Sequence, residues 1–262
     1  MITSNQNPKV KLVRALLGRT KERREAGAFV VEGVRLLEEA VKSGWKIQFV
    51  LFDDSLNERG KSQVEGLRSK GVEVEEVSPS VMKSISETDA PQGVVAVVQF
   101  TNLPFPESPN FILIPDQIRD PGNLGTLLRS AAATGVQAVL IPPETTDAFA
   151  PKVVRAGMGA HFRVPIRMMS WGEIEQVIKL EGLKVFVADM DGQSCWETNL
   201  REPVALIIGS EADGVSESAR GVADGSISIP MTGEVESLNA GVAGSVLLFE
   251  AVRQRKAGGT VE

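Results

Sequence analysis

Short apolar runs that alternate with helical patterns are the feature that most constrains how this chain can fold. Strand-like runs occur at residues 111–114, 136–141, 164–166, 184–188, 204–208 and 226–229, with helical patterns between them. A last helix is predicted from about residue 237 to residue 255. Apolar strands that alternate with helices predict a parallel sheet covered by helices on both faces. Ligands of such sheets bind at the carboxyl ends of the strands, so the informative residues should follow strands.

The first hundred residues predict a smaller α/β domain. Helical spacing covers a basic segment at 9–24 and residues 34–41, 56–70 and 80–86, and strands are predicted at 46–52, 72–77 and 93–100. The sequence TNLPFPESPN at 101–110 has three prolines and two asparagines, a composition typical of a linker. We therefore predict an α/β protein with domains at 1–102 and 111–262 and a linker at 103–110.

Composition excludes several classes of protein. The 262 residues are 42% hydrophobic and 24% charged, which is typical of a globular protein and argues against disordered, collagen-like and coiled-coil chains. No apolar run approaches the length of a membrane helix, so we expect no membrane partner. The single cysteine, Cys195, and the single histidine, His161, cannot build a cysteine or histidine zinc site. We expect a cytoplasmic protein without a metal.

The charge distribution leaves two interpretations open. The net charge of −6 argues against nucleic acid as a partner, but residues 9–24 hold seven basic residues and one acid. The basic residues are Lys9, Lys11, Arg14, Arg19, Lys21, Arg23 and Arg24. This segment is either a surface that contacts phosphates or a solvated helix face. Its helical apolar spacing argues against a third interpretation, a transit peptide.

Three polar loops follow predicted strands. The first runs from Asp116 to Gly125 and contains Asn123, with Arg129 six residues later in the following helix. Free backbone N–H groups at the start of that helix would suit an anion. The alternative is an ordinary turn from strand to helix with a surface arginine.

The second loop, GSEADG at 209–214, follows the strand at 204–208. Its two glycines would let a ligand approach the backbone, and Glu211 brings a carboxylate to the strand end. A turn with a capping acid is the alternative. The chain lacks the G-x-G-x-x-G and P-loop motifs, which argues against a generic nucleotide-binding enzyme. The third loop, IPMTGEVESLN at 229–239, ends where Ser237 or Asn239 can start the last helix, and Ser237 alone could be a plain N-cap.

Taken together, the three loops resemble the three motifs of the SpoU family, within the SPOUT superfamily of RNA methyltransferases. Their order, the spacing from Asn123 to Arg129, the G-x-E-x-x-G after a buried strand and the IPM…SLN ending all match. The basic helix, residues 29–33 and residues 90–93 are similar to the family's N-terminal RNA-substrate domain, which resembles a ribosomal-protein fold. The resemblance extends over roughly residues 9–255. One departure is Ala240-Gly241, where the family usually has valine and serine.

The resemblance implies an enzyme that methylates a ribose 2′-hydroxyl of RNA with S-adenosylmethionine. It also implies a parallel-sheet SPOUT domain with a C-terminal trefoil knot, after the small RNA-binding domain. The expected catalytic residues are Arg129, Asn123, Glu211, Ser237 and Asn239. The expected cofactor contacts are Ile208, Gly209, Ile229, Pro230, Met231 and Leu238. Because arginine is a poor base, Arg129 is expected to hold a phosphate and stabilise the developing alkoxide.

The expected partners are RNA and a second copy of the chain. Arg155 and Arg163 are further candidates for RNA contacts. Ribosomal RNA is preferred to transfer RNA, because the N-terminal domain resembles those of family members that modify ribosomal RNA. A catalytically silent RNA-binding or ribosome-assembly protein is the alternative from another functional class. The homodimer is expected to pack through the last helix, where the apolar residues are Val242, Val246, Leu247 and Phe249.

Overall fold

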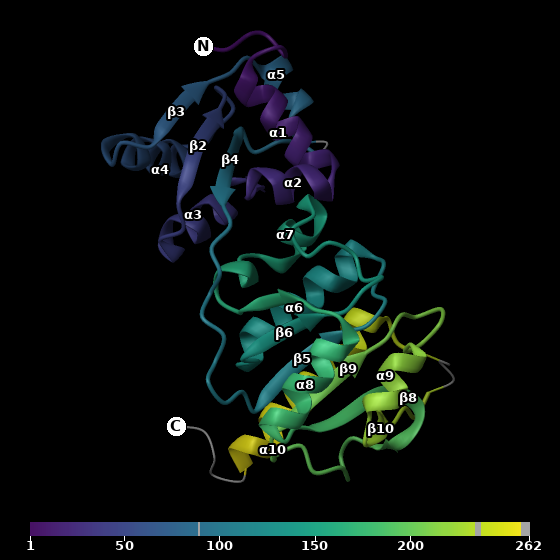
Figure 1. Ribbon diagram of the computed structural model, residues 1–262. Helices are drawn as coiled ribbons and strands as arrows, with labels where there is room; N and C mark the ends of the chain where they lie inside the picture. The colour runs from purple at the N-terminus through teal and green to yellow at the C-terminus, as the bar shows by residue number, and fades with distance from the viewer. Residues whose placement is uncertain (89, 234–236, 258–262) are drawn as a thin grey trace. The chain divides into compact units, whose positions relative to one another are not determined.

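The computed structural model describes residues 1–88, 90–233 and 237–257 (Figure 1). The chain divides into two compact units. Unit 1 consists of Met1–Asn102 with Phe149–Phe162, and unit 2 consists of Leu103–Ala148 with Arg163–Glu262. This division differs from the predicted domains in two segments: residues 103–110 group with unit 2, and residues 149–162 group with unit 1.

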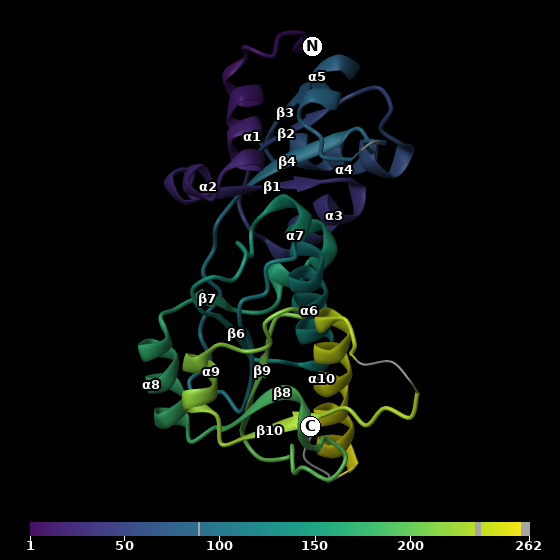
Figure 2. The same ribbon diagram turned by 90° about the vertical axis from the view of Figure 1, so that its right-hand side faces the viewer.

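Unit 1 is a mixed sheet between two layers of helices. Its strands are β1 (Ala28–Glu32), β2 (Ile47–Phe52), β3 (Glu73–Glu76) and β4 (Val94–Gln99), in the order β1-β4-β2-β3. The β4 strand is antiparallel to β1 and β2, whereas β2 and β3 are parallel. Helices α1 (Pro8–Gly18) and α5 (Pro79–Ser84) bury apolar side chains against one face of the sheet. Helices α3 (Val34–Ser43) and α4 (Glu58–Ser69) lie on the other face (Figure 2).

The basic segment forms two helices where one was predicted. Helix α1 buries Val10, Val13 and Leu16, and α2 (Thr20–Ala26) follows after Arg19, whose extended backbone (φ −127°, ψ 134°) interrupts the helix. Arg23 of α2 is only 3% exposed, and its Nη1 donates a 2.6 Å hydrogen bond to the carbonyl oxygen of Leu16. This hydrogen bond joins the two helices, so the interruption at Arg19 is a fixed part of the fold.

Aromatic packing explains why residues 149–162 belong to unit 1. This segment contains α7 (Pro151–Gly157) and a 3₁₀ turn, η1 (Ala160–Phe162). The ring of Phe29 in β1 lies 5.1 Å from that of Phe149 and 6.1 Å from that of Phe162, between centroids. Trp45 lies edge-on to Phe162 at 5.1 Å. His161 is buried in the same cluster.

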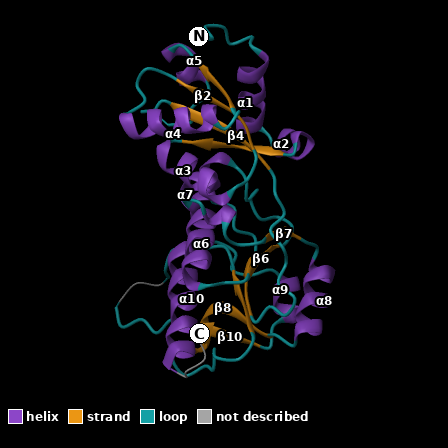
Figure 3. Cartoon of the chain, turned by 90° about the vertical axis from the view of Figure 1, so that its left-hand side faces the viewer, coloured by secondary structure: helices purple, strands orange, loops and turns teal. Residues whose placement is uncertain are grey.

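Unit 2 contains the parallel sheet that the sequence predicts. Strands β5 (Phe111–Pro115), β6 (Ala138–Ile141), β7 (Ile166–Met168), β8 (Lys184–Ser194), β9 (Val204–Ile208) and β10 (Gly225–Ser228) have the order β10-β8-β9-β5-β6-β7. All neighbouring pairs are parallel. Helices α6 (Pro121–Thr134) and α10 (Ala240–Ala257) cover one face, and α8 (Trp171–Glu181) and α9 (Glu217–Val222) cover the other (Figure 3). The prediction of an α/β chain with a parallel sheet is confirmed.

Two local features of unit 2 differ from the prediction. Strand β8 continues to Ser194, six residues beyond its predicted end, because a register shift lets Gln193 pair with Ile227. Gly192 permits this close approach, since an added Cβ would lie 2.6 Å from the Ile227 nitrogen. The predicted linker is anchored: Phe105 packs against the cluster under α8 and α9, and Arg167 donates to the Leu103 carbonyl. Among the described residues, no helix is both long and apolar enough to span a membrane.

Candidate active site

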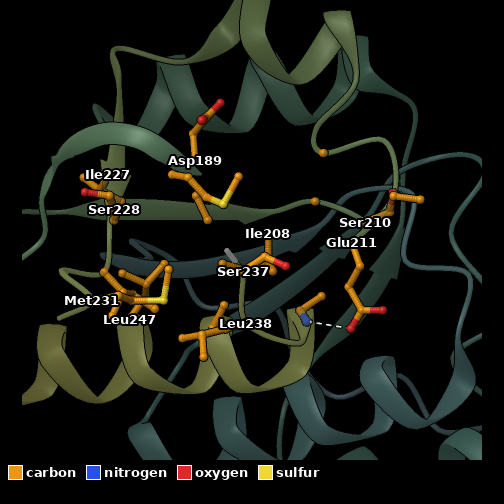
Figure 4. Close-up of a pocket in the computed structure, with 18 of the residues that line it drawn as sticks. Asp189, Ile208, Ser210, Glu211, Ile227, Ser228, Met231, Ser237, Leu238 and Leu247 are labelled. Carbon is orange, nitrogen blue, oxygen red and sulfur yellow. Dashed lines mark hydrogen bonds between the residues drawn. The ribbon is translucent and has the colours of Figure 1, made fainter. Parts of the chain in front are cut away.

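A pocket of about 330 Å³ lies beside the middle of β8 and the ends of β9 and β10, against the first turns of α10 (Figure 4). Its apolar surface includes Ile208 at the end of β9, Leu238 before α10, and Leu247 within α10. Ser210 and Ser228 add hydroxyl groups. The pocket therefore lies at the carboxyl edge of the sheet, where the alternation of strands and helices predicts a ligand.

The structure brings together most of the residues predicted to contact a cofactor. The pocket lining includes Ile208, Gly209, Ile229, Met231 and Leu238. It includes Glu211 and Ser237 as well, whereas Pro230 is not part of the lining in the described chain. The assignment of these residues as cofactor contacts remains a prediction, now with a cavity to match it.

Sequence reasoning missed the contribution of β8. Ala188, Asp189 and Met190 line the pocket, and Asp189 Oδ2 lies 3.1 Å from Arg220 Nη1, another lining residue. Asp189 directly follows the predicted strand at 184–188. The rule that ligands bind at carboxyl ends of strands would have found it, had it been applied to every strand.

Glu211 is the centre of a hydrogen-bond network at one end of the pocket. Its Oε1 accepts from Asn123 Nδ2 (3.1 Å), from Asn239 Nδ2 (2.5 Å) and from the backbone N–H of Ala240 (2.9 Å; Figure 4). Asn239 Nδ2 also donates to Asn123 Oδ1 at 2.8 Å. The network joins all three motif loops, as the family resemblance implies for these residues.

The start of α10 decides between the roles predicted for Ser237 and Asn239. The helix begins at Ala240, three residues later than predicted, and Asn239 Oδ1 accepts from the Val242 N–H at 3.1 Å. Asn239 is therefore the N-cap, and its amide nitrogen remains available to Glu211. Ser237 lies before the helix, exposed and on the pocket lining, so its hydroxyl is not used as the cap.

Arg129 lies in the middle of α6 and not at its start. Helix α6 begins at Pro121, where Asp120 Oδ1 accepts from the Asn123 N–H at 2.8 Å, and Arg129 comes eight residues after Pro121, on the exposed surface. The first N–H groups of α6 and the Arg129 guanidinium are thus separated by about two helical turns.

Gly209 lies against the backbone of its own loop. Ser210 and Gly214 exchange two backbone hydrogen bonds of 2.8 and 3.0 Å, which close the loop. A Cβ added at Gly209 would lie 2.3 Å from the Gly214 oxygen. A side chain at this position would therefore obstruct the chain itself, and the contact of Gly209 with a ligand stays a prediction.

A buried carboxylate joins the first and second loops. Asp116, which directly follows β5, is fully buried, and its Oδ2 accepts a 2.6 Å hydrogen bond from the Ser216 N–H. Burial raises the pKa of Asp116, while the hydrogen bonds from Ser216 oppose that shift. The Asp116 N–H donates to the Ile208 carbonyl at 2.8 Å, so this residue also fixes the end of β9 beside the pocket.

The predicted RNA-contact residues differ in exposure. Lys11, Arg14, Arg19, Lys21, Arg24 and Arg163 are exposed. The other three make contacts with residues of unit 1. Arg23 is buried, Lys9 forms ion pairs with Glu73 and Glu75 of β3, and Arg155 lies 3.7 Å from both Glu32 and Glu87. Arg23 in particular lies inside unit 1 and not on the surface that the sequence predicted.

Comparison with known proteins agrees with this architecture. Residues 110–249 match the SpoU rRNA Methylase family, and residues 7–96 match the MRM3-like substrate binding domain. RlmP of Bacillus subtilis, a 23S rRNA (guanosine(2553)-2′-O)-methyltransferase, is 32% identical over 95% of this chain and 97% of its own. A 23S rRNA (uridine(2479)-2′-O)-methyltransferase of Streptomyces viridochromogenes is 33% identical over 98% of this chain and 93% of its own.

A solved structure extends the likeness to three dimensions. The crystal structure of the SpoU methyltransferase AviRb from Streptomyces viridochromogenes, in complex with AdoMet, superposes with a TM-score of 0.87. It is 31% identical, and the match covers 96% of this chain and 99% of that one. A parallel α/β sheet with this pocket and these three loops defines an RNA methyltransferase fold. This chain belongs to the SpoU rRNA methylase family.

Proposed function

We propose that this chain transfers the methyl group of S-adenosylmethionine to a ribose 2′-hydroxyl of ribosomal RNA. The observation that carries the proposal is the network of Asn123, Glu211 and Asn239 beside the pocket. It unites three of the five residues that the family resemblance assigns to the reaction site. The two relatives compared above act on a guanosine and a uridine of 23S rRNA, and the AviRb structure holds AdoMet.

The pocket fits S-adenosylmethionine in size and chemistry. Its volume of about 330 Å³ falls within the usual range for small-molecule sites. Ile208, Leu238 and Leu247 would hold an aromatic base and exclude water, and the Ser210 and Ser228 hydroxyls would contact polar groups. When bound, this cofactor supplies an electrophilic methyl group on a sulfonium centre.

Within the network, Glu211 positions the side chains of the two asparagines. Glu211 fixes Asn123, Asn239 and the first N–H of α10, so the two asparagine amides have one orientation before RNA binds. Ser237, exposed on the pocket lining, is free to contact the ribose. Arg129 would hold a phosphate and stabilise the negative charge that develops on the 2′-oxygen.

The outer side of α10 supports a homodimer as part of this proposal. Val242, Val246 and Phe249 are 47%, 38% and 52% exposed, whereas Leu247, predicted in the same surface, is buried and lines the pocket. In α6, Ser130 bonds Ser245 of α10 at 2.7 Å, so the neighbouring Arg129 lies near this surface. A second copy seated on α10 would bring its own Arg129 toward this site.

Light scattering tests the dimer directly. The wild-type chain should have a dimer's mass at micromolar concentration. Phe249→Glu should be monomeric and should lose methyl transfer if Arg129 acts across the interface. A monomeric wild-type chain would contradict this part of the proposal. The C-terminal trefoil knot remains a prediction from the family resemblance.

Methyl transfer to unmodified RNA tests the function itself. Labelled S-adenosylmethionine, the purified protein and in vitro transcribed 23S rRNA should give label in the RNA, and mapping should locate it on a ribose. Transfer RNA transcripts, assayed in parallel, should accept much less. Cofactor binding by calorimetry without any transfer would favour the silent RNA-binding protein, and label in transfer RNA alone would reverse the substrate preference.

A further inference from the structure

Two non-glycine residues at neighbouring strand ends adopt a backbone conformation that favours glycine. Gln117 follows β5 and has a φ of +53°, and Glu144 follows β6 and has a φ of +66°. Glycine adopts such angles without steric cost, whereas other residues do so rarely. Strain of this kind tends to persist where a side chain has a function, and here both positions carry long polar side chains.

The two side chains meet, and an arginine joins them. Gln117 Nε2 donates to Glu144 Oε2 at 3.3 Å. Arg119 Nη2 lies 3.8 Å from the same oxygen, and Arg119 Nη1 lies 3.5 Å from Asp213 Oδ2. The Arg119, Glu144 and Asp213 side chains are 65%, 64% and 56% exposed. Ion pairs this exposed add little stability, so stability alone does not explain the arrangement.

Hydrogen bonds to the backbone fix the two loops that carry these side chains. The Thr146 N–H donates to the Ile118 carbonyl at 3.0 Å, and Thr145 Oγ1 donates to the Pro115 carbonyl at 2.9 Å. The loops after β5 and β6 are therefore fixed against each other. A fixed, exposed group of donors and acceptors can recognise a hydrogen-bonding partner without prior ordering.

The arrangement adjoins the reaction network. Arg119 directly precedes Asp120, which caps the helix that carries Asn123. Asp213 lies two residues after Glu211 in the same loop. The base attached to a ribose at the Asn123–Glu211–Asn239 network must lie over one of the adjoining loops, and the loops after β5 and β6 offer these polar groups there.

We propose that Gln117, Arg119 and Glu144 recognise the base of the nucleotide that is methylated, and that they select guanine; the proposal rests on the proposed function. A carboxylate accepts two N–H groups at once, and guanine presents adjacent N1–H and N2–H donors beside the O6 acceptor. The Arg119 guanidinium or the Gln117 amide can donate to O6. Uracil offers a single N–H between two carbonyl oxygens, which matches this set poorly.

The relatives differ in the base of the nucleotide on which they act. Two of them, 32% and 33% identical to this chain, act on a guanosine and on a uridine. The shared fold therefore does not determine the base. Individual side chains near the site must do so, and Gln117, Arg119 and Glu144 are suitably placed.

Because of the positive φ angles, both side chains can be removed by substitution with glycine. Glu144→Gly and Gln117→Gly remove the side chains at positions where glycine is unstrained, so both variants should fold, with melting temperatures near that of the wild type. Each is assayed with four 23S rRNA transcripts that differ only at the mapped target nucleotide. Wild type should prefer guanosine by at least about 10-fold in kcat/KM, and Glu144→Gly should reduce this to about 2-fold or less. Gln117→Gly should reduce it in part.

A matched control separates base recognition from general charge. Glu175→Gln in α8 removes an exposed carboxylate elsewhere in unit 2 and should keep the full preference. Cofactor affinity should be unchanged in every variant. An equal loss on all four transcripts, an unchanged preference in Glu144→Gly, or a wild-type preference for another base would overturn this inference alone. Absence of transfer by the wild type to any ribosomal transcript would overturn the proposed function and this inference with it.

Discussion

The side-chain amide of Asn123 donates a 3.1 Å hydrogen bond to Glu211, across 88 residues of sequence. Two further donors, Asn239 and the Ala240 N–H, share the same carboxylate oxygen. Glu211→Ala would leave all three without their acceptor and release both asparagines. We expect methyl transfer to fall by at least about 10²-fold, as for other preorganised catalytic hydrogen bonds, with cofactor affinity within a few-fold of wild type. Single-turnover transfer and calorimetry measure the two, and near-normal transfer would contradict the positioning role.

Two variants of Arg129 distinguish the contribution of its charge to methyl transfer from the contribution of its planar geometry. Arg129→Lys keeps the positive charge but loses the planar two-point contact with a phosphate, and Arg129→Ala loses both. Both variants should bind cofactor normally and lose about 10²-fold or more in single-turnover methyl transfer, with little rescue by lysine. Because Arg129 is exposed, neither change should unfold the protein. Transfer by Arg129→Ala close to the wild-type rate would assign this arginine to the solvated surface.

We expect substitution of Gly209 to lower the stability of the fold even when no ligand is present. An alanine Cβ would lie 2.3 Å from the Gly214 oxygen, so the closed loop at 209–214 must open or shift. We expect Gly209→Ala to lose about 1–3 kcal/mol in urea denaturation without any ligand. Gly172→Ala in α8 is the control, because its added Cβ meets no described atom within 4 Å, and it should be neutral or slightly stabilising. Equal stability of the two variants would show that the loop can relax.

The exposed basic residues of α1 and α2 should control the salt dependence of RNA binding. Replacing Arg14, Lys21 and Arg24 with glutamine removes three exposed charges without touching the buried Arg23. If each contacts a phosphate, the slope of log affinity against log salt should become shallower by about 0.7–0.9 for each lost contact. Replacing three exposed lysines or arginines of α4 is the control: Arg59, Lys61 and Arg68. An unchanged slope in the first variant would indicate a solvated helix face.

Glu250 gives a prediction about acid stability. It is 7% exposed in α10, and hydrogen bonds from Arg253 lower its pKa, with burial acting in the opposite direction. Because the folded pKa lies below the unfolded value of about 4.3, the ionised carboxylate stabilises the fold at neutral pH. That contribution is lost as the pH falls through the folded pKa. Between about pH 6 and pH 3, wild type should lose about 1 kcal/mol more unfolding free energy than Glu250→Gln. Parallel losses in urea titrations would contradict this.

Periodicity predicted the sheet of unit 2 well because its central strands, β9, β5 and β6, are buried on both faces and bounded by helices. Strand β9 coincides with its predicted range, Val204–Ile208, and its neighbours differ by a few residues. The extension of β8 could not be predicted, since it depends on a register shift against β10, which no local pattern specifies. The interruption at Arg19 was also hidden, because residues 18–25 contain no apolar residue whose spacing could mark a second helix, and only the Arg23–Leu16 hydrogen bond identifies the junction.

The site was predicted through its motifs, and the sequence alone left its geometry open. Asn123, Glu211 and Asn239 were grouped by resemblance, and the structure connects them through one carboxylate oxygen. The close approach of Gly209 to Gly214 could not be predicted, because a contact between two stretches of backbone cannot be recognised from either stretch alone. Backbone angles are similarly invisible in the sequence, so nothing marked Gln117 or Glu144 as unusual.

The chain passes between its two units three times, after residues 102, 148 and 162. During synthesis from the N-terminus, the first hundred residues therefore emerge with an incomplete core. Phe29 and Trp45 lack their ring partners Phe149 and Phe162 until the ribosome has added β5, α6 and β6, which belong to the other unit. A nascent chain arrested near residue 110 would present this aromatic surface to solvent and to chaperones, whereas one arrested well beyond residue 162 would not. The two units are thus coupled in their order of completion, although each has its own sheet.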